Sequence, residues 1–458
     1  MRFPGLTIAL VCTICFGCKT DQKKPYQNNM DPYTYELGVV AGFSELINAG
    51  VKKLALSAPL TPDEMDRFML EAEKVAARHN VLVYRESELL VTDLFPSDVA
   101  SGKDVLLFYK GTTLEQYLSL KSDKKELEET GSYDSEASIK LARRFGRLLS
   151  YSPREINRLL SQNSSFRTMD DFGIRANNLF LYYKDLAKAV DFYSNTLGME
   201  VVADYEMAFI LRMTADSYLI LVDASKGMHT SEEPKTVALA LLTGQLDEWY
   251  PYLKSQKVEF KYEYKPKEGS AHDGFVVVDP EGYLLEFERF NQHPENEDFV
   301  PILNQNKKQT MQSLGENSLP EGLSIHSTIT WLYYKDLLGM QNFYQDLLGL
   351  EMVADQGWTK IYKVSQTGFL GLVDEKRGMH AFTLEKAVNV GFIIDDLEGW
   401  FEYAKERKLF ELYEEELGVG PEIRYKAFVG FCPENYYLEF DRFFPHDDNA
   451  LLLTYLNK

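Results

Sequence analysis

Side chains able to do acid–base chemistry recur at matching positions in the C-terminal part of this chain. A histidine closes each of two V-D-x-x-[KR]-G-M-H sequences, and each of two late segments carries two acidic residues two positions apart. These residues are His229 and His380, Glu286 and Glu288, and Glu439 and Asp441. Imidazole transfers protons near neutral pH, and carboxylates held close together raise the pKa of one of them. The pattern predicts general acid–base catalysis or the binding of a hard cation, with the two histidines as candidate catalytic residues.

A second reading of the same residues stays open. The histidines can bind a carbonyl group, or they can be an inheritance from a common ancestor without a present role. The carboxylates, together with Asp223 and Asp374, can be charges at strand ends that reach water.

These residues recur because the C-terminal part of the chain is a tandem repeat. Tyr333 minus Tyr182, His380 minus His229 and Trp400 minus Trp249 all give 151. A constant offset over this length indicates two copies of one domain.

Each copy has the same order of expected elements, a strand, a helix and three strands, which then occurs a second time. In the first copy, residues 178–183 alternate as a strand and 186–197 form an amphipathic helix. A second strand at 237–242 and a helix at 246–256 restart the order. The second copy repeats it from Thr328 to Phe443.

Residues 31–165 match neither copy and predict a small α/β domain of unknown role. Segments 53–57, 81–84 and 105–109 read as strands, and Thr61-Pro62-Asp63-Glu64 is a helix start signal. Basic residues at helical spacing between Lys140 and Arg147 predict a solvated helix face rather than an anion site.

The N-terminus has the build of a secretory signal. Arg2 precedes an apolar run that ends at Cys18 and is too short to span a bilayer. Its last residues, Ile-Cys-Phe-Gly-Cys, resemble a bacterial lipoprotein box, which implies removal of residues 1–18 up to a lipidated Cys18. Residues 19–30 then form a polar tether, and the protein is expected to lie in the bacterial cell envelope, anchored to a membrane by lipid. The alternative is an ordinary secreted protein.

The composition of the chain limits which binding partners and which cysteine chemistry we expect. The formal net charge is -21, from 70 acidic and 49 basic residues, which disfavours binding to nucleic acid. Of the four cysteines only Cys432 lies in the folded body, so no internal disulfide is possible there. Because Cys432 occupies the position of Asp279 in the first copy, it reads as a turn substitution rather than a nucleophile.

The repeats resemble the vicinal oxygen chelate superfamily, which includes glyoxalase I, bleomycin resistance proteins and extradiol dioxygenases. The resemblance lies in NLFLYYKDLAKAVDFYSNTLGMEV and VVVDPEGYLLEFERF, and again in WLYYKDLLGMQNFYQDLLGLEM and FCPENYYLEFDRF. It implies an α+β fold with two tandem domains, at 174–292 and 324–445, in which paired βαβββ units form U-shaped barrels. Residues 293–323 would be a linker and 446–458 a C-terminal tail.

The resemblance also implies where a metal would be held. Family enzymes bind a divalent ion through His, Glu or Gln on the first and fourth strands of each unit. The matching positions are Asn178, Leu221, Ala238 and Glu286 in the first copy and Ile329, Leu372, Asn389 and Glu439 in the second. Only the final glutamate remains in each copy. We therefore expect no metal at this position and no cofactor.

One face of the first strand in each copy is aromatic. Alternation places Asn178, Phe180 and Tyr182 together, and Ile329, Trp331 and Tyr333 in the other copy. Such a face suits a planar or apolar ligand, although the rings can equally fill a cavity as core. The expected ligand-binding residues are Asn178, Phe180, Tyr182, Glu286, Trp331, Tyr333, Asn389 and Glu439.

Three functions follow as hypotheses. The first is a membrane-anchored protein that binds a small organic molecule without the family's metal. The second is an enzyme, a lyase or a ring-cleaving dioxygenase, with a relocated set of His and carboxylate residues. The third is a structural lipoprotein whose repeats have lost their cavities.

Overall fold

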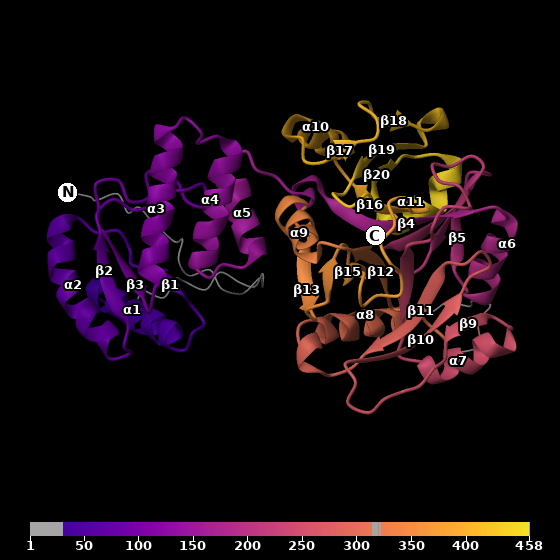
Figure 1. Cartoon of the computed structure of the whole chain (residues 1–458), viewed down its shortest axis with the longest axis horizontal. Coiled ribbons are helices and arrows are strands. Elements are labelled where there is room, and N and C mark those ends of the chain that lie inside the picture. The colour runs from indigo at the N-terminus through magenta and orange to yellow at the C-terminus, as the bar shows by residue number, and fades with distance from the viewer. Residues whose placement is uncertain (1–30, 314–318, 320–321, 458) are drawn as a thin grey trace, which may run out of the picture. The chain divides into compact units, whose positions relative to one another are not determined.

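The computed structural model describes residues 31–313, 319 and 322–457, which form a mixed α+β chain with three sheets (Figure 1). They divide into two compact units. One contains the described residues up to Leu89 together with Ala100–Gln116, and the other contains Leu90–Val99 and the described residues from Tyr117 onward.

The first unit packs two helices on a three-stranded antiparallel sheet of order β1-β3-β2. Helix α2 begins at the expected signal, where Thr61 and Glu64 form a capping box. The elements are α1 (Pro32–Asn48), β1 (Leu54–Leu56), α2 (Pro62–Ala77), β2 (Leu82–Glu86) and β3 (Val105–Tyr109).

Helix α3 (Thr113–Glu129) leads into the second unit, which also contains α4 (Ser135–Leu148) and α5 (Pro153–Asn163). The basic face of α4 is not wholly solvated, contrary to expectation. Arg143 is buried, donates to Asn157 at 2.7 Å and lies 3.4 Å from an Asp346 carboxylate oxygen. A buried guanidinium needs such partners, which the helical spacing of the basic residues did not reveal.

Four similar βαβ-type units follow, two in each copy. The first copy comprises β4 (Ile174–Tyr183), α6 (Leu186–Asp191), β5 (Glu200–Asp204), β6 (Ala208–Arg212) and β7 (Ser217–Asp223), then β8 (Val237–Leu242), α7 (Leu246–Ser255), β9 (Glu259–Tyr262), β10 (His272–Val278) and β11 (Leu284–Phe290). Helix α8 (Phe299–Ser313) leads toward the second copy.

The second copy repeats this order and ends in a short helix. It comprises β12 (Ser327–Tyr334), α9 (Leu337–Asn342), β13 (Glu351–Asp355), β14 (Thr359–Lys363) and β15 (Gly368–Asp374), then β16 (Val388–Ile394), α10 (Leu397–Arg407), β17 (Glu411–Leu412), β18 (Gly418–Val419), β19 (Tyr425–Phe431), β20 (Tyr437–Phe443) and α11 (Ala450–Leu456).

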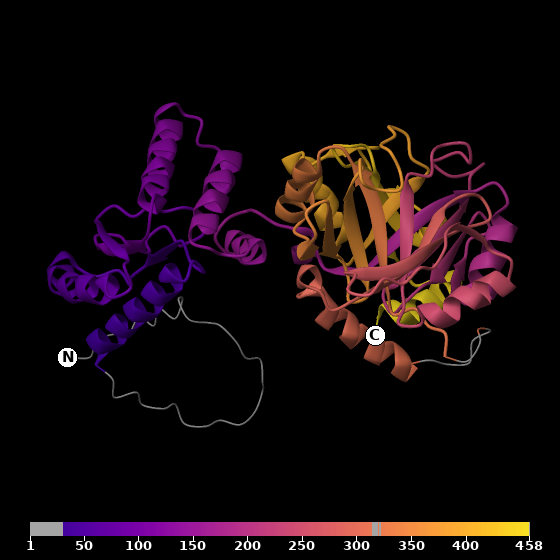
Figure 2. The same cartoon turned by 60° about the horizontal axis from the view of Figure 1, so that its bottom comes forward.

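Each large sheet contains one half of each copy, β8–β11 with β12–β15 and β4–β7 with β16–β20. The two copies thus exchange their halves, which corrects the expectation that each copy closes its own sheet. An eight-stranded sheet has the order β13-β14-β15-β12-β8-β11-β10-β9, and the other large sheet runs β17-β19-β20-β16-β4-β7-β6-β5, with β18 added to β19. The junctions are β12 against β8 and β16 against β4, both antiparallel. Figure 1 labels β16 beside β4, and Figure 2 shows orange strands of the second copy next to magenta strands of the first. Because the units are so alike, the first strand of one unit can pair with the first strand of more than one partner.

Each sheet has a helix-covered face and a concave face of different character. Leu179, Leu181 and Tyr183 of β4 join the main core, which also holds Trp249 of α7 and Trp400 of α10. The alternate residues of the strands form two separate clusters, one for each sheet. The candidate site residues lie on these second faces.

Candidate ligand cavities

The eight-stranded sheet surrounds a cavity of about 470 Å³, here called the eight-strand cavity. Because of the exchange, β9, β10 and β11 of the first copy and β12, β14 and β15 of the second supply its lining. The residues used below are Glu286, Glu288, Trp331, Tyr333, Trp358 and Arg377.

The nine-stranded sheet surrounds a second cavity, of about 360 Å³, here called the nine-strand cavity. Phe180 and Tyr182 of β4 line it, opposite carboxyl groups from β20 of the other copy. Its lining also includes Tyr205, Arg424, Tyr425, Glu439 and Asp441.

Each cavity contains a pair of carboxyl groups, Glu288 or Asp441 buried and Glu286 or Glu439 partly accessible, whose pKa values burial raises. The pKa of Glu286 rises to about 7, and the charge of Glu286 adds to burial in raising the pKa of Glu288. In the other pair, burial raises the pKa of Asp441 to about 7 and, together with the charge of Asp441, raises that of Glu439. Each pair therefore retains a proton near neutral pH, which makes it able to act as both acid and base.

Only the nine-strand cavity supplies hydrogen-bond donors to its pair. The Asn389 amide donates to Glu439 at 2.6 Å, and the Asn178 amide donates to Asp441 at 2.8 Å. Gly391 leaves room for this, because a Cβ at its position would lie 2.1 Å from Asn178 Oδ1.

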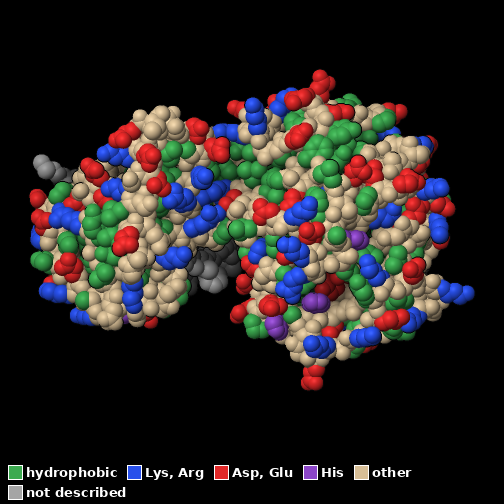
Figure 3. Space-filling model, in the orientation of Figure 1, with side chains coloured by type: hydrophobic (Ala, Val, Ile, Leu, Met, Phe, Trp, Pro, Cys, Tyr) green, Lys and Arg blue, Asp and Glu red, His purple; other side chains and the backbone are tan. Residues whose placement is uncertain are grey.

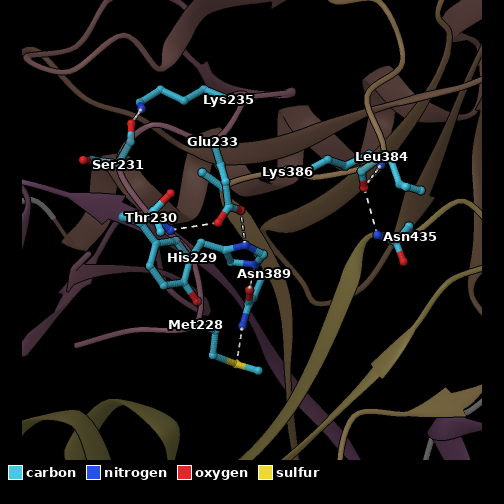
Figure 4. A network of polar contacts seen from close by, with 12 residues as sticks. Met228, His229, Thr230, Ser231, Glu233, Lys235, Leu384, Lys386, Asn389 and Asn435 are labelled. Atoms are coloured by element: carbon cyan, nitrogen blue, oxygen red, sulfur yellow. Dashed lines mark hydrogen bonds and ion pairs between the residues drawn. The ribbon is translucent and has the colours of Figure 1, made fainter. Parts of the chain in front are cut away.

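His229 extends these bonds into a chain of four residues, of which Figure 4 shows Glu233, His229 and Asn389. Its Nδ1 lies 2.6 Å from Glu233 Oε2, and its Nε2 lies 2.9 Å from Asn389 Oδ1, which continues to Glu439. The imidazole is 3% exposed and packs edge-on against Tyr182. Both ring nitrogens therefore face oxygen atoms of neighbouring side chains.

His380 has no such chain. It packs edge-on against Tyr333, but its Nε2 is buried without a hydrogen-bond partner, and burial lowers its pKa to about 4. Ala238 stands where the other cavity has Asn389, so no amide can bridge His380 to Glu286. The structure thus places the two candidate histidines in unequal surroundings.

The aromatic rings expected on the first strands line cavities and also pack. Trp331 is 6% exposed, lies in the wall of the eight-strand cavity and has a buried indole nitrogen without a partner. Gly371 admits the ring, because a Cβ there would lie 2.0 Å from Trp331 Cε3. The open volume beside these rings disfavours the reading that they only fill the core.

Two residues matched to the family's metal positions point away from the cavities, which corrects their assignment by motif. Leu221 and Leu372 belong to the core under the helices, and the neighbours Ile220 and Val373 line the cavities instead. A register error of one residue reverses the face of a strand.

The remaining donors do not fit the family's metal. At the positions matched to the family's ligands, the eight-strand cavity has Glu286 beside the apolar Ile329 and Ala238, and in the nine-strand cavity the amides of Asn178 and Asn389 already bond the carboxylates. Within residues 31–313, 319 and 322–457, no three His, Cys, Asp or Glu side chains are grouped to hold an ion. The donor set thus lacks the three or more protein ligands that such ions require.

Other polar residues from the repeats serve the fold. Asp223 accepts from the Ser225 amide at 2.9 Å and hydroxyl at 2.7 Å, as expected of a turn at a strand end.

Burial raises the pKa of Cys432, whose Sγ accepts from the Tyr436 amide at 3.2 Å. Asp279 accepts the corresponding bond from the Tyr283 amide at 2.8 Å. Cys432 is thus a buried turn residue.

Cys18, the expected lipidation site, lies outside the described residues. In the part of the chain that is described, no helix is both long and apolar enough to cross a membrane.

On the face shown in Figure 3, acidic and basic side chains are interspersed, and hydrophobic side chains gather over β17 and β19. Tyr413, Val419 and Ile423 are exposed hydrophobic residues of this region.

Glu233 is a site residue that the motif did not reveal. It follows His229 by four residues in a loop, and Leu384 occupies the equivalent position after His380. The only signal in the sequence was this difference between the copies.

Comparison with known proteins gives a family match for part of the chain. Residues 175–287 match the model of the Glyoxalase/Bleomycin resistance protein/Dioxygenase superfamily. The matched segment runs from β4 to β11, whose two halves lie in different sheets.

Solved structures give weak likenesses. Glyoxalase I from Zea mays is 14% identical with a TM-score of 0.43, over 63% of this chain and 97% of that chain. A putative dioxygenase from Bacillus subtilis is 14% identical with a TM-score of 0.39, over 63% and 90%. TioX from Micromonospora is 18% identical with a TM-score of 0.23, over 25% and 98%. No curated protein sequence matches the chain. These likenesses do not specify an activity.

Proposed function

We propose that this protein binds a small organic molecule in the cavities of its exchanged sheets, without the superfamily's metal. The observation that carries the proposal is the eight-strand cavity, about 470 Å³ in volume, with the carboxyl groups of Glu286 and Glu288 and the indole of Trp331 in its lining. The Trp331 nitrogen and Glu288 Oε2 have no hydrogen-bond partner among the residues that the structure describes. Because buried polar groups are normally paired, these orphaned atoms favour a ligand that completes them after a small side-chain movement.

The proposed setting is a membrane surface. The apolar run before Cys18 and its lipoprotein-like sequence favour a lipid anchor that holds the folded body outside the cytoplasm. A periplasmic or surface location then exposes the cavities to small molecules of the envelope or the medium.

The test is a thermal-shift screen of planar and apolar compounds, followed by titration of tryptophan fluorescence. Ligands should quench Trp331, so the signal change should be much smaller in Trp331→Phe, where Trp358 is the indole left in the cavity lining. The change should be kept in Trp249→Phe, which alters an indole buried in the core under the helices. If Trp331→Ala leaves every affinity unchanged, the proposed site is wrong.

The chain Glu233–His229–Asn389–Glu439 specifically favours a second candidate, an acid–base enzyme acting in the nine-strand cavity. Glu439 would exchange a proton with the bound molecule, while the other three residues hold its carboxyl group in position. A reaction found for the protein should lose activity in Glu439→Gln, and His229→Gln should shift its pH profile. Unchanged turnover in Glu439→Gln would contradict this candidate.

A further inference from the structure

The two cavities differ in what surrounds their carboxyl pairs. Position for position, the donors Asn178 and Asn389 of the nine-strand cavity are replaced by Ile329 and Ala238 in the eight-strand cavity. Among the described residues, no side chain or backbone group donates to Glu286, and Glu288 Oε2 has no partner. This pair has therefore lost its hydrogen-bond donors while remaining buried.

The free-energy cost of burying Glu286 and Glu288 without hydrogen-bond donors indicates which kind of ligand would stabilise them. Glu288 is 5% exposed, while Glu286 stays partly accessible in the cavity wall. An ionised carboxylate that is buried without donors loses several kcal/mol of hydration, on the order of the penalty for an unpaired ion in a protein. A group that brings both positive charge and N–H donors removes this penalty.

The walls of the cavity suit such a group. Trp331, Tyr333 and Trp358 present aromatic rings beside the carboxyl pair. Aromatic faces attract an organic cation, and the attraction is strongest for indole when water is excluded. Trp331 also leaves its indole N–H without an acceptor, which a polar atom elsewhere on the ligand would satisfy.

Charges of the same sign as the ligand lie only at exposed positions. Lys265, Lys267 and Arg377 line the cavity but are exposed, and the Arg377 guanidinium stacks 4.7 Å from the Trp358 ring. Exposed charges are screened by salt, so they oppose a cation less than the buried pair attracts it. Burial lowers the pKa of His272, the cavity's imidazole, which disfavours a positive charge on that ring.

The remaining charged groups near the cavity are already engaged. Asp273 pairs with Arg289 at 3.2 Å and accepts from Asn291 at 3.1 Å. The unpaired charge that faces the cavity therefore resides on Glu286 and Glu288.

We propose that the eight-strand cavity binds an organic cation, a protonated amine on a planar or apolar body, with its ammonium group against Glu286 and Glu288. This rests on the proposed binding function and names the ligand class for one of the two cavities. The nine-strand cavity, whose pair is bonded to amides, does not share the preference.

Binding of the ammonium ion requires an ionised carboxyl group, so it displaces a proton from the pair. Since the Glu286 pKa is about 7, the fraction of pairs able to accept the cation rises between pH 6 and pH 8. Affinity for the cation should increase about tenfold over this range, whereas affinity for a neutral molecule should not increase.

The experiment compares benzylammonium with benzyl alcohol, a neutral probe of similar shape, by calorimetric titration of the full mature protein. Benzylammonium should bind about tenfold or more tightly than benzyl alcohol at pH 8, and the difference should shrink at pH 6. Glu286→Gln and Glu288→Gln should abolish the preference, and the matched change Glu439→Gln in the nine-strand cavity should leave it intact.

The outcomes separate this inference from the proposed function. If benzyl alcohol binds at the Trp331 site as tightly as benzylammonium, the site stands but its cation preference is wrong. If neither probe binds, or if Glu286→Gln and Glu439→Gln affect benzylammonium equally, the inference is also overturned. Tryptophan fluorescence of each unliganded variant shows whether its sheets have folded.

Discussion

Replacing His229 and Glu439 by alanine, singly and together, should show that these side chains act as one unit. Asn389 joins them, with its Oδ1 2.9 Å from the imidazole and its amide donating to the carboxylate at 2.6 Å. Removing His229 leaves Asn389 Oδ1 and Glu233 Oε2 without their imidazole partner, each an atom of a buried or half-buried group that costs about 1–3 kcal/mol when unsatisfied. We expect His229→Ala to lower the free energy of unfolding by about 2–5 kcal/mol.

The coupling between the two residues is the sharper quantity. Once His229 is absent, Asn389 can turn, and Glu439→Ala then costs less than it does in the wild type. We expect the double variant to be less destabilised than the sum of the single variants by about 1–3 kcal/mol, the range found for residues that share a hydrogen-bond network.

The other cavity supplies the matched control. His380 and Glu286 occupy the equivalent positions, but Ala238 provides no bridge and His380 Nε2 has no partner. Their double-mutant cycle should show coupling within about 0.5 kcal/mol.

Urea unfolding followed by tryptophan fluorescence measures both cycles. All four tryptophans of the chain lie in the two copies, so the signal reports on the exchanged sheets. Coupling within about 0.5 kcal/mol for His229 and Glu439, or equal coupling in the two cycles, would refute the hydrogen-bonded chain.

Four further predictions concern single changes. Burial raises the Glu286 pKa from 4.5 to about 7, so the native state holds a proton that the unfolded chain releases. The free energy of unfolding should therefore fall by up to about 3 kcal/mol between pH 4.5 and 7. In urea titrations, Glu286→Gln should flatten this fall. Gly391→Ala should displace the Asn178 amide from Asp441 and cost about 1–3 kcal/mol, whereas an unchanged urea midpoint would show that the amide adapts freely. Cys18→Ala should leave an uncleaved or soluble protein, and a processed membrane-bound variant would disprove lipidation. Elemental analysis of the purified protein should find no stoichiometric divalent metal, and iron, zinc or manganese that is lost on Glu286→Ala would contradict this.

Alternation along the strands was sufficient to predict which residues share the inner faces. Phe180 and Tyr182 line one cavity, and Trp331 and Tyr333 line the other, because a strand with one helix-covered face fixes the side of every residue. Matching by motif, in contrast, placed Leu221 in the site with an error of one residue.

The exchange of halves was beyond prediction from the sequence. Pairing between β12 and β8 is a choice among near-identical units, and the inner faces of all four are apolar enough to pack either way. The local hydrophobic pattern specifies a strand and its two faces. Which of several similar strands it pairs with depends on the packing of the complete sheets.

The hydrogen-bonded chain was only half visible in the sequence. Asn389 and Glu439 were matched to one site of the second copy, but nothing in the sequence indicated that His229 of the first copy would meet them. The exchange brings them together, and a loop residue, Glu233, completes the chain. Contacts made by loops across copies leave no periodic signal.

A crystal structure of the full mature protein soaked with benzylammonium tests the central claim most directly. The account predicts electron density for the probe in the eight-strand cavity, with its nitrogen within hydrogen-bond distance of Glu286 or Glu288 and its ring against Trp331. A cavity closed by the Trp331 and Tyr333 rings, or one in which Glu286 coordinates a metal ion, would contradict it.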